Sequence, residues 1–188
     1  MNNRENISRQ ALELFSKKGY DAVGVQEIID AAGIAKPTLY HYFGSKEGLL
    51  KTVLKEYFDK LYPAVETAAV YNGDIKNTLQ KITAALVGFA KNNKDFYRMQ
   101  LSMWFAPAES ASNKAVTEQN TKIFNLIENV FEQASKDHGN MKGRQALYAA
   151  TFLGIINTHI GMYFNGYVKP DEKFIQTVLH QFMHGIFS

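Results

Sequence analysis

Long stretches of helix-spaced apolar residues constrain the fold of this chain most strongly. Only four of its 188 residues are prolines, and apolar side chains recur at three- and four-residue steps between the breaks. No clear strand-like alternation or hairpin turn competes with this pattern. The sequence therefore predicts an all-α protein of about nine helices.

The expected helices divide into two groups. They cover residues 5–18, 25–32, 36–43, 46–62, 75–91, 94–105, 114–135, 142–167 and 171–187. The fourth helix has two apolar columns, which indicates contact on two sides and a bridge between two packing units. We therefore expect an N-terminal domain over 1–48, a C-terminal helical domain over 49–188, and the helix over 46–62 as connector.

Composition excludes several classes of site and location. With no cysteine, the chain has no disulfides, thiolate zinc sites, iron–sulfur clusters or cysteine nucleophiles. The polar start does not fit a signal peptide, and no apolar run is long enough to span a membrane, so a cytoplasmic protein is expected. The net charge of +3 is only mildly basic and neither demands nor excludes a polyanionic partner.

Enzyme motifs are missing from the sequence. We find no glycine-rich phosphate loop, no nucleophile elbow and no His-Glu-x-x-His pattern. His180 and His184 have the four-residue spacing of a metal pair, but no third ligand is evident nearby. The sequence therefore predicts neither an enzyme nor a metal or cofactor site.

Two short helices near the N-terminus form the most informative pattern. The segments 25–32 and 36–43 are separated only by Gly33-Ile34-Ala35. Two short helices joined by a tight, glycine-containing turn are typical of a helix-turn-helix, whose second helix enters the DNA major groove.

A helical wheel separates the two faces of the segment 36–43. Leu39 and Phe43 share the core face, Pro37 and His41 lie opposite, and Tyr42 falls nearer the core edge. Polar groups suited to bases or phosphates are Thr38, Tyr40 and Tyr42, with Lys36 and Lys46 at the two ends. The alternative is that these aromatics simply pack and the lysines are solvated.

The first fifty residues resemble a known family. Ala11–Phe15, Lys18–Tyr20, Ala31–Ile34 and Lys36–Leu50 are similar to the DNA-binding domain of the tetracycline-repressor (TetR) family. The resemblance implies a homodimeric regulator that binds a palindromic operator and is usually a repressor. It also implies a small molecule in the C-terminal core that moves the fourth helix and releases DNA.

Carried over position by position, the family's DNA contacts fall on Lys36, Pro37, Thr38, Tyr40, His41, Tyr42 and Lys46. Three departures bear on operator sequence and affinity. Val23-Gly24 stands where the family usually has a Ser or Thr cap, and Ala35 replaces the usual Ser. Gln26 occupies a position that is often Arg and is a further candidate contact.

Two aromatic segments in the C-terminal part are candidates for an effector pocket. Their residues of interest are Tyr97, Met103, Trp104, Phe152, His159 and Tyr163. Apolar and aromatic linings with a few polar groups suit small-molecule sites, and methionine suits adaptable ones. A hydrophobic or aromatic effector would fit, although such stripes also occur in ordinary cores.

The last two expected helices have the pattern of a dimer seam. Small residues at 150, 154, 158 and 161 would let another helix approach closely. The candidate interface residues are Gly154, Thr158, Gly161, Val178, Phe182 and Ile186. Two such helices from each subunit can form a four-helix interface, and packing within one chain is the alternative.

The sequence thus favours a ligand-responsive DNA-binding regulator. A helical dimeric adaptor without DNA binding is the alternative, but it assigns no function to Thr38, Tyr40 and His41. Salt dependence separates the two functions, because lysine–phosphate contacts release counterions.

Overall fold

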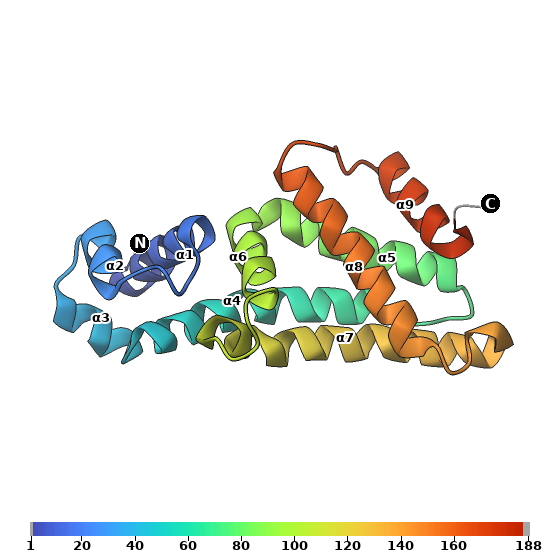
Figure 1. The fold of residues 1–188 in the computed structure, drawn as a ribbon, viewed down its shortest axis with the longest axis horizontal. Helices are drawn as coiled ribbons and strands as arrows, with labels where there is room; N and C mark the ends of the chain where they lie inside the picture. Colours follow the sequence, from blue (N-terminus) through green and yellow to red (C-terminus); the bar gives the residue numbers. More distant parts are fainter. Residues whose placement is uncertain (1, 186–188) are drawn as a thin grey trace. The chain divides into compact units, whose positions relative to one another are not determined.

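The computed structural model describes residues 2–185, and within them it contains nine α-helices, one short 3-10 helix and no strand (Figure 1). The helices are α1 (Asn3–Lys18), α2 (Val25–Ala32), α3 (Lys36–Phe43), α4 (Lys46–Ala68), α5 (Ile75–Asn92), α6 (Lys94–Trp104), α7 (Ala111–Asp137), η1 (Gly139–Met141), α8 (Gln145–Phe164) and α9 (Glu172–His184). The all-α prediction is confirmed, and most helix ends lie within three residues of those expected.

Two helix boundaries differ for identifiable reasons. α4 continues through Pro63 instead of ending at residue 62, although proline cannot donate the usual backbone hydrogen bond. Leu61 and Val65 on either side of it are buried, and burial of this face offsets the lost bond. α7 begins at Ala111 because the Ser110 Oγ accepts a hydrogen bond from the Asn113 N–H at 3.1 Å, an N-cap not recognised from the sequence.

The chain divides into two compact units. The first unit comprises residues 1–60 and 93–120, and the second comprises residues 61–92 and 121–188. α4 and α7 each contribute to both units. The N-terminal helices therefore share their unit with α6 and with the start of α7.

The first unit has a continuous apolar core. Its fully buried side chains include Ile7, Phe15, Ile28, Leu39 and Leu49 from the first four helices. α6 packs along α1 (Figure 1). The Phe96 ring of α6 also stacks on Tyr57 of α4, with ring centroids 4.5 Å apart. Stacked rings add directional packing to the burial of apolar area, so α6 is an integral part of this unit.

In the second unit α5 packs against α8 and α9. An aromatic cluster of Phe131, Phe152 and Phe182 joins α7, α8 and α9, with centroid separations between 5.6 and 6.5 Å. The Tyr71 hydroxyl donates a 2.7 Å hydrogen bond to Asp137 and thereby ties the α4–α5 loop to the end of α7. No helix within residues 2–185 is both long enough and apolar enough to cross a bilayer.

Candidate nucleic-acid interface

The turn between α2 and α3 has the geometry expected of a helix-turn-helix. α2 ends at Gly33, whose φ of 64° is left-handed and costs glycine least. The N–H groups of Gly33 and Ile34 donate to the carbonyls of Asp30 and Ile29, both at 3.2 Å, which closes the helix end. α3 begins immediately afterwards with Pro37 in its first turn, where the missing N–H costs nothing.

α3 separates a buried face from an exposed one, as predicted. Leu39 and Phe43 are buried, with 0% and 8% exposure. The outward positions are Lys36, Pro37, Tyr40, His41 and Tyr42, all exposed, and Thr38 is half-buried. Tyr42 differs from the expectation, because it is as exposed as Tyr40, at 41%, and does not turn toward the core. Its ring instead meets the His41 ring edge-on, with centroids 5.2 Å apart.

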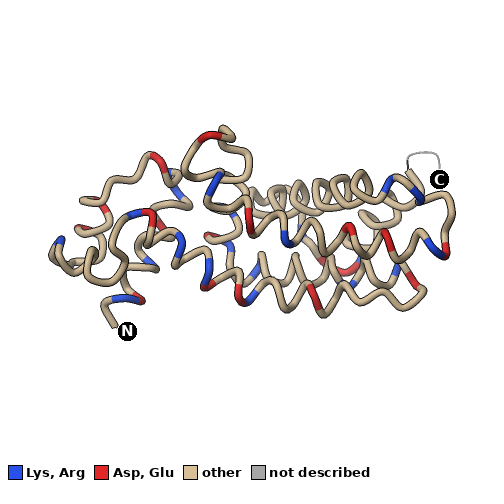
Figure 2. The backbone as a smooth tube through the Cα atoms, turned by 90° about the horizontal axis from the view of Figure 1, so that it is seen from below, with Lys and Arg blue, Asp and Glu red and all other residues tan. Residues whose placement is uncertain are grey.

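The charge pattern alone does not mark this surface. Basic and acidic residues are interspersed along the chain (Figure 2). α3 itself contains no acidic residue, and Lys36 forms no ion pair within the described part of the chain. An exposed helix with a free lysine at its start and no acid is suited to approach a phosphate backbone.

Lys46 has a structural role that the sequence did not reveal. Its ammonium donates to the carbonyls of Tyr20 and Val23, at 2.9 and 2.7 Å, and lies 4.2 Å from the Tyr20 ring centroid. Burial lowers the pKa of Lys46, while the carboxylates of Asp21 and Glu27 raise it to a smaller extent. Two of its three N–H groups are thus used within the protein, which leaves one for a phosphate.

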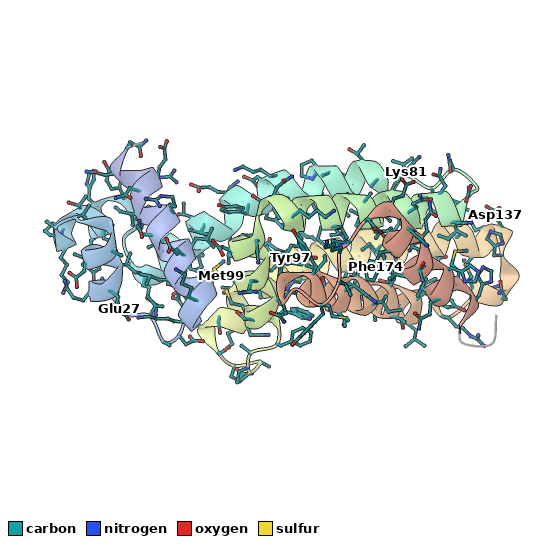
Figure 3. All side chains as sticks on the ribbon, turned by 90° about the horizontal axis from the view of Figure 1, so that it is seen from above. Glu27, Lys81, Tyr97, Met99, Asp137 and Phe174 are labelled. Atoms are coloured by element: carbon teal, nitrogen blue, oxygen red, sulfur yellow. The ribbon has the colours of Figure 1, made fainter. Side chains whose placement is uncertain are left out.

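Gln26 and Glu27 occupy the start of α2. Gln26 is exposed, and its amide donates to Asp30 at 2.7 Å. Glu27 (labelled in Figure 3) accepts the Gly24 N–H at 3.1 Å and forms an ion pair with Lys18. This carboxylate satisfies a backbone donor at the helix start, where the family's Ser or Thr cap is absent.

Gly48 is a residue that sequence reasoning did not single out. The Ser45 Oγ caps α4 by accepting the Gly48 N–H at 2.9 Å. A Cβ on Gly48 would lie only 2.0 Å from the Phe43 carbonyl oxygen. The corner between α3 and α4 therefore needs a glycine here. The available signal was a glycine at the third helical position, where a capping box has Glu or Gln.

The six candidate effector residues lie in different units. Tyr97 and Met103 are buried in the first unit, and Trp104 at the end of α6 is 41% exposed. Burial raises the pKa of the Tyr97 phenol (Figure 3) above its usual range. Phe152, His159 and Tyr163 belong to the second unit, where Phe152 is buried and the other two are half-buried.

His159 borders a small hollow within the second unit. The hollow has a volume of about 10 Å³, which is room for about one water. Its lining residues are Thr83, Val87, Ile156, His159, Ile160, Pro170, Phe174, Ile175 and Val178. The His159 Nδ1 donates to the Ile155 carbonyl at 2.7 Å, and the ring packs edge-on against Phe174, with ring centroids 5.2 Å apart.

The candidate dimer residues separate into an outward and an inward group. Gly154 and Thr158 on α8 are exposed, and Gly161 is half-buried. On α9, Val178 is buried within the unit, and Phe182 contacts Phe131 and Phe152. Ile186 lies outside the described residues.

Comparison with known sequences identifies the family. Residues 7–53 match the sequence profile of "Bacterial regulatory proteins, tetR family". The transcriptional activator FasR of Mycolicibacterium smegmatis is 30% identical over 165 residues, which cover 87% of this chain and 72% of FasR. The chain belongs to the TetR family. The HTH-type transcriptional repressor BdcR of Escherichia coli is 42% identical over 87 residues, 46% of this chain and 41% of BdcR.

Solved structures of similar length share the whole fold. A Clostridium perfringens protein provisionally described as a fatty acid metabolism regulator superposes with a TM-score of 0.83 at 20% identity, covering 96% of this chain and 98% of that one. FadR of Bacillus subtilis, solved with stearoyl-CoA, superposes with a TM-score of 0.77 at 19% identity, and the match covers 97% of this chain and 98% of FadR. Members of the TetR family are transcriptional regulators and not enzymes. The helix-turn-helix of this chain corresponds to the DNA-binding element of the family.

Proposed function

We propose that this TetR-family regulator is a homodimeric repressor that reads a palindromic operator with α3 and is released by a hydrophobic small molecule. The observation that carries the DNA-reading part is the exposed face of α3. Pro37, Tyr40 and His41 point outward while Leu39 and Phe43 anchor the helix from below. A helix presented in this way fits the major groove.

Selection of genomic DNA tests the proposed function. The purified protein is mixed with fragments of its own genome, including DNA upstream of its own gene, and the retained fragments are sequenced. A shared inverted repeat is expected, with affinity that falls steeply as salt rises because lysine–phosphate contacts release counterions. A folded dimer that enriches no sequence at low salt would favour the adaptor function.

The homodimer proposal is supported by the composition of α8. This helix has no Asp, Glu, Lys or Arg, yet Leu147, Gly154 and Thr158 are exposed on one side of it. A helix without charged residues is normally covered on most of its sides, and a second copy of α8 would cover the exposed side. The row of small residues permits the close approach that such a pair needs.

Gly154→Leu is expected to weaken dimerisation by at least about tenfold, the effect of about 1.4 kcal/mol. Nothing lies within 4 Å of a Cβ built on Gly154, so the leucine fits the isolated chain and obstructs only a partner. Sedimentation or light scattering over a dilution series measures the effect. Gly139→Leu, also exposed and uncrowded, is the matched control. An unchanged dimer in the Gly154 variant would contradict the α8 interface.

Long-chain acyl-CoA is the effector class we propose to test first. The Bacillus subtilis FadR that shares this fold was solved with stearoyl-CoA, and a hydrophobic effector suits the aromatic segments of this chain. The selected operator complex is challenged with stearoyl-CoA, and free CoA serves as control. Release by stearoyl-CoA but not by free CoA would support this effector class, and no release by either would contradict it.

A further inference from the structure

The α1–α2 turn, residues 19–24, is held from two directions within the first unit. From one direction, Lys46 at the start of α4 donates to the carbonyls of Tyr20 and Val23. From the other, the Ser112 Oγ at the start of α7 donates to Asp21 Oδ2 at 2.6 Å. Ser112 is only 2% exposed. The length is typical of a hydroxyl bonded to a carboxylate, which is stronger than a neutral hydrogen bond.

The α6–α7 corner that carries Ser112 is itself well ordered by hydrogen bonds. The Ser110 Oγ accepts the Asn113 N–H and donates to the Pro107 carbonyl at 2.7 Å. The Asn113 side chain donates to the Trp104 carbonyl at 2.9 Å. Ser112 is therefore fixed relative to the end of α6, and α6 packs along α1.

The Asp21 carboxylate lies near two positively charged groups. It lies at the first turn of α7, where unpaired N–H groups give the helix a partial positive charge. Burial lowers the pKa of the Lys46 ammonium, and the negative charge of the same carboxylate raises it to a smaller extent. The α1–α2 turn thus connects the α6–α7 corner, through Asp21, to the start of α4, through the Tyr20 and Val23 carbonyls. α4 begins three residues after α3 ends.

We propose that Asp21 and Ser112 are positioning residues for DNA reading. Their hydrogen bond sets the orientation of the α2–α3 pair relative to the α6–α7 corner, although neither residue lies on the exposed face of α3. This inference rests on the proposed DNA-binding function.

Operator affinity is the first test. Ser112→Ala and Asp21→Ala are each expected to lower affinity about tenfold. The double variant should lower it by much less than the product of the two single effects, because both substitutions remove the Asp21–Ser112 bond. Asp21→Asn should retain most of the affinity, since the amide oxygen still accepts the Ser112 proton. Thr117→Ala is the matched control on α7, because the Thr117 hydroxyl donates to the Asn113 carbonyl of its own helix. Unchanged affinity in both alanine variants would overturn the proposal.

A second readout does not depend on an operator. The chain has no cysteine, so nitroxide labels can be placed at Ala31→Cys and Thr117→Cys, both exposed and both in the first unit. Ser112→Ala is expected to broaden or shift the distance distribution between the labels, while Asp21→Asn keeps it. The proposal is overturned if Ser112→Ala leaves the distance distribution unchanged and lowers affinity only by the fraction of protein that is unfolded. The bond would then stabilise the fold without orienting the α2–α3 pair. If the unaltered chain selects no operator, the proposed function fails, and the distances still decide the positioning role.

Discussion

Gly48→Ala is expected to destabilise the protein by about 3 kcal/mol, the upper end of the usual cost of overpacking. The added Cβ would lie 2.0 Å from the Phe43 carbonyl oxygen and 3.2 Å from its carbon. These are backbone atoms, so no side-chain rotation can relieve the clash, and the corner between α3 and α4 must open. Because α3 is attached through this corner, operator affinity should fall together with stability.

Thermal unfolding measures the stability effect, and a fall in Tm of roughly 10 °C is expected for a chain of this size. Gly88→Ala is the matched control, since Gly88 lies inside α5 and a Cβ added there would meet nothing within 4 Å. That variant should be neutral or slightly stabilising, because alanine favours helix more than glycine does. Equal Tm values for the two variants would mean that the corner tolerates a side chain.

Tyr40→Ala/His41→Ala is expected to have the opposite profile, with operator affinity lowered about 100-fold and stability almost unchanged. Each base-edge or groove contact is worth about 1–3 kcal/mol of discrimination, and two are removed. Both side chains are exposed, so their truncation should change the free energy of unfolding by no more than about 0.5 kcal/mol. Electrophoretic mobility shift on the selected operator, alongside thermal unfolding, measures both quantities.

Tyr167→Ala is the control for this pair, because Tyr167 is also an exposed aromatic, at 75%, but lies in the second unit. It should bind operator normally. Lys46→Ala would be a poor probe of phosphate contact, since it also removes two hydrogen bonds to the carbonyls of the α1–α2 turn. Full operator affinity in the Tyr40/His41 variant would exclude the exposed face of α3 as the reading surface.

The sequence by itself determined the helices and the turn between α2 and α3. Apolar spacing marks the core face of each helix, Gly33 permits the left-handed residue that ends α2, and Pro37 starts α3. These are local rules, because each depends on residues within a few positions of one another. The same locality explains the error at Pro63, where burial of Leu61 and Val65 outweighs a local breaker.

Only the tertiary structure decided which polar and small residues have partners far along the chain. Lys46 meets carbonyls 23 and 26 positions away, and Ser112 meets Asp21 across 91 positions. The need for glycine at position 48 comes from how α4 passes the end of α3. Sequence periodicity shows which face of a helix is apolar. It does not show which distant backbone or side-chain group that helix will meet, because that depends on how the helices pack in three dimensions.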